Sequence, residues 1–228
     1  MRAAEVTVDA LPAILEFCRS NEARLLIARC LTSELSAVQA MEREGFLLMD
    51  TLVYYERDLL KTPIPPDQGR IPIRTFRPGE EDAVRAVAAS AFRGYFGHYH
   101  ADSRLDRHRS DEAYADWAQR SCLSGEAADE VLVADCDGKP VGFTTLRMNS
   151  PTEGEGVLVA VAPEAQGRGV CVSFMVHAMK WCLSRGASTM IISTQLTNLS
   201  AQKAWVRVGF RPVQSYYTFH KWFDNLGC

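Results

Sequence analysis

The segment VLVAVAPEAQGRGVC (residues 157–171) runs from a strand of small and β-branched residues straight into a glycine-bearing turn and a helix. Pro163 ends the strand, because proline cannot donate a hydrogen bond to a sheet ladder. The free N–H groups at the helix start, together with the helix dipole, can bind an anion such as phosphate. Gly167 and Gly169 let the backbone approach a ligand closely, and Arg168 can add a charge-assisted contact. The segment therefore predicts a strand, turn and helix around an anion site.

The glycine turn alone leaves the function open. Neither nucleotide fingerprint, GxGxxG or GxxxxGK[ST], fits it, and an ordinary βα turn in which Gly169 allows close packing is the alternative. A second segment, NLSAQKAWVRVGF (residues 198–210), narrows the choice. Asn198 is a favourable N-cap and Gly209 a favourable helix end. One apolar face lies between them, formed by Leu199, Ala201, Ala204, Trp205 and Val208.

Together the two segments resemble the GCN5-related N-acetyltransferases (GNAT). That family's acetyl-CoA motif is Gln/Arg-x-x-Gly-x-Gly/Ala, followed later by an Asn-x-x-Ala-x-x-x-Tyr-x-x-x-Gly-Phe helix. The first pattern falls on Gln166, Gly169 and Cys171, and the second falls on Asn198, Ala201, Trp205, Gly209 and Phe210. The resemblance implies an α/β GNAT fold, in which helices flank a mixed β-sheet that splays between residues 157–162 and 189–194.

The resemblance also implies that an amine attacks acetyl-CoA directly and that no metal takes part. The backbone of Val159, Ala160 and Val161 is expected to hold the pantetheine and the acetyl oxygen. The glycine turn would take the pyrophosphate, and Asn198 would reach the pantetheine arm. The residues expected at acetyl-CoA are Val159, Ala160, Val161, Gln166, Gly167, Arg168, Gly169, Val170, Cys171, Asn198, Ala201 and Trp205.

Trp205 stands where many family members carry the tyrosine that protonates the departing thiolate. An indole N–H donates a hydrogen bond but is no acid near neutral pH, so we expect Trp205 to act as a wall beside the pantetheine. Tyr216 or Tyr217 could supply the proton, and strand alternation turns only one of them inward. A thiol with a pKa near 8.5 also leaves without help, which is the alternative.

A base is needed as well, because the acceptor ammonium must lose a proton before it attacks. Glu155 aligns with a carboxylate that some family members use through water; a solvated loop charge is the alternative reading. His98 and His100 are further candidates, since histidine titrates in the useful range. The catalytic candidates are therefore Glu155, Tyr216, Tyr217 and His100.

Composition excludes several other classes of function. With 228 residues, 47% of them apolar, the chain can bury one full core and a smaller lobe. A net charge of −3 and no basic stripe argue against nucleic acid. No apolar run is long enough to span a membrane, and acids at Glu5 and Asp9 argue against a signal peptide, so a cytoplasmic location is expected. Seven cysteines without CxxC spacing predict free thiols rather than metal or disulfide sites.

The chain is expected to have two lobes. Residues 61–72 are rich in proline and predict a linker between an N-terminal lobe (1–60) and an acetyltransferase domain (73–228). Residues 35–46 align without a gap with residues 199–210, and seven of the twelve positions are identical. The small N-terminal α/β lobe is therefore expected to be a degenerate half-GNAT without a glycine turn; chance similarity of two amphipathic helices is the alternative.

The acceptor is expected to be a small amine. The layout resembles the family members that acetylate a dTDP-4-amino-4,6-dideoxyhexose (the TDP-fucosamine acetyltransferase type). By that resemblance an amino-sugar pocket would be lined by Phe96, His98, Tyr99, His100, Asp102 and Arg104, and Arg104 or Arg107 could meet the diphosphate. The alternatives are a loop that merely packs on the sheet, an acetyltransferase for another amine, antibiotic or peptide, and a non-catalytic acyl-CoA sensor. A homodimer is possible.

Overall fold

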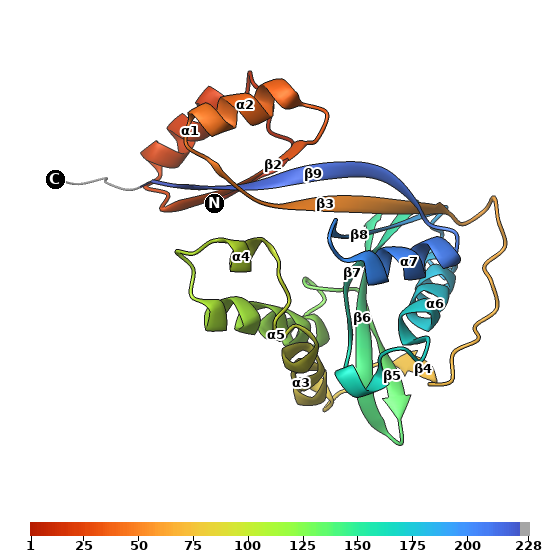
Figure 1. Cartoon of the computed structure of the whole chain (residues 1–228). Helices are drawn as coiled ribbons and strands as arrows, with labels where there is room; N and C mark the ends of the chain where they lie inside the picture. Colours follow the sequence, from red (N-terminus) through yellow and green to blue (C-terminus); the bar gives the residue numbers. More distant parts are fainter. Residues whose placement is uncertain (224–228) are drawn as a thin grey trace.

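A computed structural model describes residues 1–223 as one nine-stranded sheet with helices on both faces (Figure 1). The strand order is β1-β2-β9-β3-β8-β7-β6-β5-β4. The elements are β1 (Arg2–Ala3), α1 (Leu11–Ser20), β2 (Leu25–Leu31), α2 (Leu35–Arg43), β3 (Leu47–Asp58), β4 (Ile73–Thr75), α3 (Glu81–Ala91), α4 (His98–Ala101), α5 (Arg107–Leu123), β5 (Glu130–Cys136), β6 (Lys139–Ser150), β7 (Glu153–Val161), the 3-10 turn η1 (Pro163–Ala165), α6 (Val170–Ser184), β8 (Thr189–Gln195), α7 (Leu199–Arg207) and β9 (Arg211–Trp222).

The sheet splays where the resemblance places the opening. Strands β7 and β8 are parallel neighbours, but they pair only over residues 153–156 and 189–192. Beyond that point β7 continues to Val161 and β8 to Gln195 without pairing to each other. A bulge accompanies the divergence, because Gly156 pairs with Leu146 while Leu158 pairs with Thr145, which leaves one extra residue in β7. A bulge bends and twists its strand, and it turns this one away from β8.

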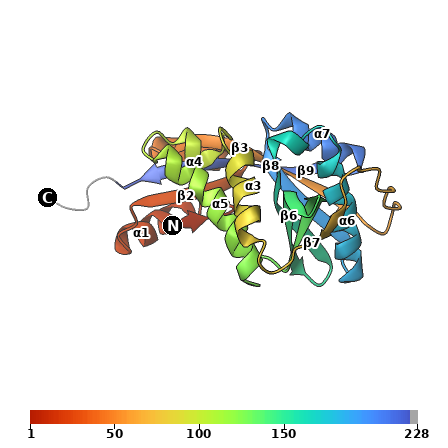
Figure 2. The same ribbon diagram turned by 90° about the horizontal axis from the view of Figure 1, so that it is seen from below.

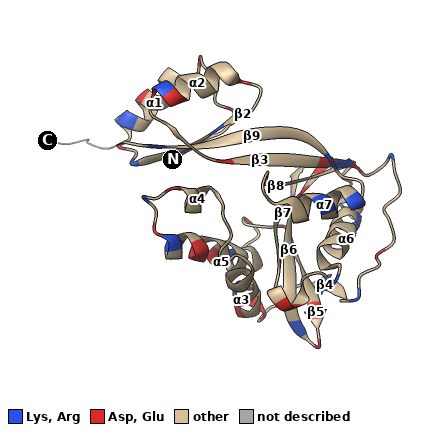
Figure 3. Cartoon of the chain, in the orientation of Figure 1, with Lys and Arg blue, Asp and Glu red and all other residues tan. Residues whose placement is uncertain are grey.

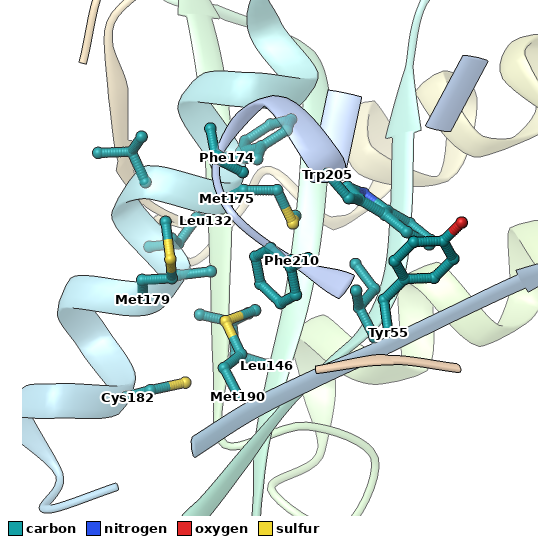
Figure 4. Packing of buried hydrophobic residues seen from close by; sticks show 14 of the residues in the cluster. Tyr55, Leu132, Leu146, Phe174, Met175, Met179, Cys182, Met190, Trp205 and Phe210 are labelled. Carbon is teal, nitrogen blue, oxygen red and sulfur yellow. The ribbon is translucent and has the colours of Figure 1, made fainter. Parts of the chain in front are cut away.

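Three buried clusters hold the helices on the sheet. The largest joins α6 and α7 to β3, β5, β6 and β8, and Figure 4 shows Phe174, Met175 and Met179 of α6 meeting Trp205 of α7 and Phe210. A second cluster joins α3 and α5 to the other side of β5, β6 and β7, as the view from below shows (Figure 2). The third joins α1 and α2 to β2 and β9.

The expected half-copy is present element by element. Strand β2, helix α2 and strand β3 have the same lengths as β8, α7 and β9, and their first residues Leu25, Leu35 and Leu47 each precede Thr189, Leu199 and Arg211 by the same interval. The two copies exchange their last strands: β9 lies between β2 and β3, and β3 lies between β9 and β8. The pairing repeats as well, since Leu31 faces Tyr216 and the equivalent Gln195 faces Leu52. The two copies are thus related by a pseudo-twofold axis between β3 and β9.

The proline-rich segment 61–72 connects the two copies. It runs beside α6 (Figure 1), where Asp67 accepts hydrogen bonds from Ser173 Oγ (2.7 Å) and His177 Nε2 (3.1 Å). The segment is therefore fastened to the helix that follows the glycine turn. The division into 1–60, 61–72 and 73–228 remains a prediction, and the N-terminal copy shares one continuous sheet with the rest of the chain.

The surface and the thiols add little that specifies a function. Lys and Arg alternate with Asp and Glu along the ribbon (Figure 3). Within residues 1–223, no helix has the length and apolarity that crossing a membrane requires. Six cysteines lie in this range as free thiols, and Cys228 lies outside the described residues.

Candidate active site

A cavity of about 1780 Å³ passes through the opening between β7 and β8. The start of α6 and one face of α7 line one end of it, and α5, the loop before α4 and the N-terminal strands line the other. The predicted site residues that the cavity brings together are Phe96, His98, Tyr99, Glu155, Val159, Ala160, Val161, Gln166, Gly167, Gly169, Val170, Cys171, Asn198, Ala201 and Trp205. Predicted residues in the described chain that do not line it are Arg168, His100, Asp102, Arg104, Arg107, Tyr216 and Tyr217.

The glycine turn and the first turn of α6 present free backbone N–H groups. Gly167 and Gly169 have φ values of 73° and 83°, in the left-handed region that side chains avoid. A Cβ on either residue would meet nothing within 4 Å, so the backbone conformation, and not crowding, requires glycine. Ser173 makes the first bond of the helix, to the Gly169 carbonyl, so the N–H groups of residues 170–172 have no partner within α6. These N–H groups can hold a pyrophosphate.

Strand β7 supplies a second set of free backbone groups. Backbone N–H and C=O groups point alternately to the two sides of a strand. Those of residues 157–161 that face β6 are paired, whereas those that face β8 open into the cavity because β8 has diverged. Gln166 Nε2 donates to the Val161 carbonyl (3.1 Å) and ties the turn to the strand end. An extended chain with amide groups, such as pantetheine, fits this edge.

Helix α7 closes the same end of the cavity. The side chain of Asn198 caps the helix by accepting from the Ala201 N–H (3.3 Å), and its Nδ2 donates to Thr194 Oγ1 (3.0 Å) at the end of β8. Trp205 is only 3% exposed and packs edge-on against Tyr55, with ring centroids 5.5 Å apart. Its indole Nε1 is buried, and within residues 1–223 it has no hydrogen-bond partner of standard geometry, although the Cys171 thiol lies next to it. Burial raises the pKa of the Cys171 thiol to about 11, and the Trp205 indole opposes that rise.

The carboxylate of Glu155 lies on β7 where the strands part. It pairs with Arg147 Nη2 of the neighbouring strand β6 at 3.2 Å, and its side chain is 15% exposed. Both residues line the cavity. The arginine thus occupies one oxygen of the carboxylate. The other oxygen would have to hold the water through which the sequence suggests that Glu155 acts as a base.

The predicted site residues between Phe96 and Arg104 lie partly at the cavity and partly in the protein interior. Phe96, His98 and Tyr99 line the cavity. His100 turns instead to Asp111 of α5, with Nε2 3.0 Å from Oδ1. Asp102 is buried beneath β9, and the Arg104 guanidinium stacks over the ring of Trp222 at 4.2 Å.

The two candidate acid tyrosines point to opposite faces of β9, as alternation requires. Tyr216 packs edge-on against Tyr54 at 5.5 Å, and its hydroxyl lies 3.3 Å from Glu5 Oε1. Burial raises the pKa of Tyr216, and Glu5 adds to that rise. Tyr217 packs with Phe219 under the N-terminal helices. A proton for the thiolate would therefore have to come from elsewhere in the cavity or from solvent.

Several cavity residues have no signal in the sequence. Arg2 and Arg29 extend from the adjacent strands β1 and β2 into the end of the cavity that lies away from the glycine turn. Arg2 donates a hydrogen bond to the hydroxyl of Tyr99, and neither arginine forms an ion pair with a carboxylate among residues 1–223. Tyr114 and Trp117 of α5 add aromatic surface at this end. The N-terminal strands β1 and β2 thus contribute two positive charges to the cavity.

The splayed sheet, the glycine turn and the cavity that joins them define an acyltransferase. The chain belongs to the acetyltransferase (GNAT) family, whose sequence profile matches residues 90–210. The crystal structure of a GCN5-related N-acetyltransferase from Sphaerobacter thermophilus aligns with a TM-score of 0.66 at 19% identity, over 94% of this chain and 69% of that one. The expected GNAT fold is therefore confirmed. Within residues 1–223 no three His, Cys, Asp or Glu side chains cluster as metal ligands would.

Two curated relatives are similar over most of the chain. Spore coat polysaccharide biosynthesis protein SpsD of Bacillus subtilis (strain 168) is 28% identical over 174 residues, which cover 74% of this chain and 58% of SpsD. A mycothiol acetyltransferase of Acidothermus cellulolyticus (strain ATCC 43068 / DSM 8971 / 11B) is 30% identical over 197 residues, which cover 78% of this chain and 57% of that protein. The chain spans just over half the length of both relatives.

Proposed function

We propose that this protein transfers the acetyl group of acetyl-CoA to the amine of a nucleotide-linked amino sugar, of the dTDP-4-amino-4,6-dideoxyhexose type. The observation that carries the proposal is one cavity with two chemically different ends, joined through the gap between β7 and β8. One end offers free backbone N–H groups, and the other offers two unpaired arginines and several aromatic rings. The similarity to SpsD, a spore coat polysaccharide biosynthesis protein, supports an acceptor of the sugar class.

The donor end suits acetyl-CoA, the co-substrate of the family. The residues proposed to hold its pyrophosphate are Gln166 to Cys171, with Arg168 reaching from outside the cavity lining. The pantetheine would lie along Val159, Ala160 and Val161, between β7 and the wall formed by Ala201 and Trp205 of α7. Asn198 has a structural role as the helix cap, and it can still offer its second amide hydrogen to the pantetheine.

In this geometry catalysis depends mainly on positioning the two reactants, and no covalent enzyme intermediate is needed. The neutral amine attacks the thioester carbonyl, a C–N bond forms, the C–S bond breaks, and sulfur keeps the electron pair. A free N–H of β7 can donate to the developing oxyanion, a contribution worth about 3–4 kcal/mol in other enzymes. Holding both reactants in one narrow opening supplies much of the remaining rate.

The acceptor end suits a sugar nucleotide. Two arginines that lack carboxylate partners suit a diphosphate, because guanidinium groups bind phosphate oxygens through paired hydrogen bonds. The rings of Tyr114 and Trp117 offer faces on which a sugar or base can stack. Phe96 and Tyr99 extend this surface toward β1 and β2. Three other predicted residues lie behind this aromatic surface: His100, Asp102 and Arg104. Their contribution would be to hold the segment 96–104 in place.

The proposal is tested by measuring thiol release from acetyl-CoA with a panel of amines that includes a dTDP-4-amino-4,6-dideoxyhexose, free amino sugars, glucosaminides of the mycothiol-precursor type and aminoglycosides. We expect the sugar nucleotide to give the highest kcat/KM, and the same sugar without the nucleotide to be a poor acceptor. A higher kcat/KM for a non-nucleotide amine would overturn the acceptor class. Tight acetyl-CoA binding without turnover on any amine would favour the acyl-CoA sensor.

Gly169→Ala should raise the Kd for acetyl-CoA about tenfold. An L-residue at a φ of 83° costs roughly 1–2 kcal/mol, and the relaxed turn would no longer aim its N–H groups at one point. Isothermal titration calorimetry measures the effect. Gly79→Ala is the matched control, since Gly79 has a φ of 97°, has equally open surroundings and lies outside the cavity lining. Equal losses of affinity in both variants would show that the turn is not the pyrophosphate site.

A further inference from the structure

A chain of three buried polar side chains joins α4 to β9. Asp102 Oδ2 lies 2.7 Å from Nδ1 of His220, and Nε2 of His220 lies 2.9 Å from Nδ1 of His98. The three residues are 4%, 0% and 7% exposed. His98 also lines the cavity, and its Nε2 has no hydrogen-bond partner in the described structure. The chain therefore begins inside the protein and ends at the acceptor end of the cavity.

The hydrogen bonds fix where the protons lie. Burial would raise the pKa of Asp102, but hydrogen bonds from His220, the Arg104 backbone and Trp222 together hold it below its usual value. Asp102 is thus a carboxylate, and it accepts the Nδ1 proton of His220. The Nε2 of a neutral His220 then accepts the Nδ1 proton of His98. As a result, Nε2 of His98, a residue that lines the cavity, carries a lone pair and no proton.

The surroundings of His98 disfavour a positive charge on its own ring. Burial first, and then the charges or potential charges of His220, Arg29, Arg2 and His100, lower the pKa of His98 to about 3. Tyr99 packs against the same ring, with centroids 3.9 Å apart. His98 is therefore a neutral acceptor throughout the physiological range. A proton that it receives can move on, because its Nδ1 proton has a path to His220 beside the Asp102 carboxylate.

The residue that precedes His98 lies at the edge of the opening in the sheet. Gly97, which precedes the helix, packs so closely that an added Cβ would lie 2.7 Å from the Tyr114 hydroxyl and 3.5 Å from Nε2 of Gln195. Gln195 is the last residue of β8, at the edge of the gap. Glu155, the base that the sequence suggests, is already engaged by Arg147.

We propose that His98 removes the proton from the acceptor's ammonium group, with His220 and Asp102 as positioning residues that take up the charge. Nε2 of His98 accepts the ammonium proton, Nδ1 of His98 passes its own proton to Nε2 of His220, and the imidazolium of His220 is paired with Asp102. The freed amine attacks the thioester; its second proton goes to the departing thiolate, and the relay returns its proton to solvent. This inference rests on the proposed acetyl transfer but not on the identity of the amine.

His98→Asn tests the relay, because an asparagine amide can keep the bond to His220 while removing the second ring nitrogen. We expect kcat at pH 7 to fall about 10²- to 10⁴-fold, with acetyl-CoA affinity and melting temperature close to those of the wild type. The ratio of wild-type to variant kcat should shrink as the pH rises toward the pKa of the amine, since a neutral amine needs no base. Asp102→Asn should cause a similar, pH-dependent loss by favouring the wrong tautomer of His220. His108→Asn, at an exposed position of α5, is the control.

A loss of kcat that is constant from pH 6 to pH 9 would mean a structural role and would overturn the proposal. So would a wild-type rate in His98→Asn. Imidazole ¹⁵N NMR of the full chain provides a measurement that needs no acceptor: we expect a protonated Nδ1 and an unprotonated Nε2 on His98, and the opposite tautomer would overturn the relay. Failure of the amine panel would count against the proposed function alone, because the tautomer is read without turnover.

Discussion

Trp205→Ala is expected to lower the free energy of unfolding by about 3–5 kcal/mol, the usual cost of truncating a buried tryptophan. The side chain is 3% exposed and lies within the main core, between Tyr55 and the start of α6 (Figure 4). The same truncation would open the wall proposed for the pantetheine, so acetyl-CoA affinity should fall as well. Chemical denaturation and calorimetric titration measure the two effects. Turnover abolished with affinity and stability intact would contradict the wall.

Trp205→Phe distinguishes the packing role of the ring from a hydrogen bond that the indole N–H could donate. A buried donor without a partner costs about 1–3 kcal/mol, so replacing the indole by a phenyl ring removes that penalty while keeping most of the packing. If the N–H donates to bound acetyl-CoA, this variant should bind acetyl-CoA less tightly although its stability is nearly unchanged. Trp181→Phe is the matched control, because Trp181 of α6 also carries a buried, unpartnered Nε1 but does not line the cavity.

Much of the fold was predictable because its signals are local. A helix cap such as Asn198 and glycines that need a positive φ act within a few residues of sequence. The Asp137-Gly138 pair has φ values of 53° and 81° in the tight turn between β5 and β6, and an Asp-Gly pair is a strong local signal for a hairpin. The repeat of α2 in α7 was visible for the same reason, since helix patterning is periodic.

The rest depends on contacts between distant segments, which one sequence does not encode locally. Nothing in β3 indicates that it inserts between β8 and β9 and so brings the N-terminal strands to the cavity. No local pattern in the sequence therefore places Arg2 and Arg29 at the cavity. His220 looked like an ordinary strand residue, although it lies 2.7 Å from Asp102 and connects it to His98. The end of the cavity at the glycine turn could be inferred from a motif, whereas the opposite end is assembled by tertiary structure.

Arg2→Ala combined with Arg29→Ala should raise the KM for an anionic acceptor by about 10²-fold or more, because each hydrogen bond to a charged group contributes roughly 1.5–3 kcal/mol. The KM for acetyl-CoA should stay the same, since both arginines lie at the opposite end of the cavity from the glycine turn. Steady-state kinetics with each substrate varied in turn measures the split. The wild-type KM for the acceptor should also rise with salt, which screens partly exposed charges, and the double variant should have lost that dependence.

Two further variants test whether the position of the arginines and the shape of the guanidinium group matter. Arg24→Ala removes an exposed arginine of the same N-terminal segment that does not line the cavity, and it should leave both KM values unchanged. Arg29→Lys keeps the charge but loses the planar fork that matches a phosphate, so an intermediate KM would indicate bidentate binding. If the double variant kept the wild-type KM for every acceptor, the anion would have to bind elsewhere, and the N-terminal copy would be purely structural. A raised acceptor KM would instead mean that the N-terminal strands β1 and β2, which reach the cavity because β3 inserts beside β8, contribute to substrate binding.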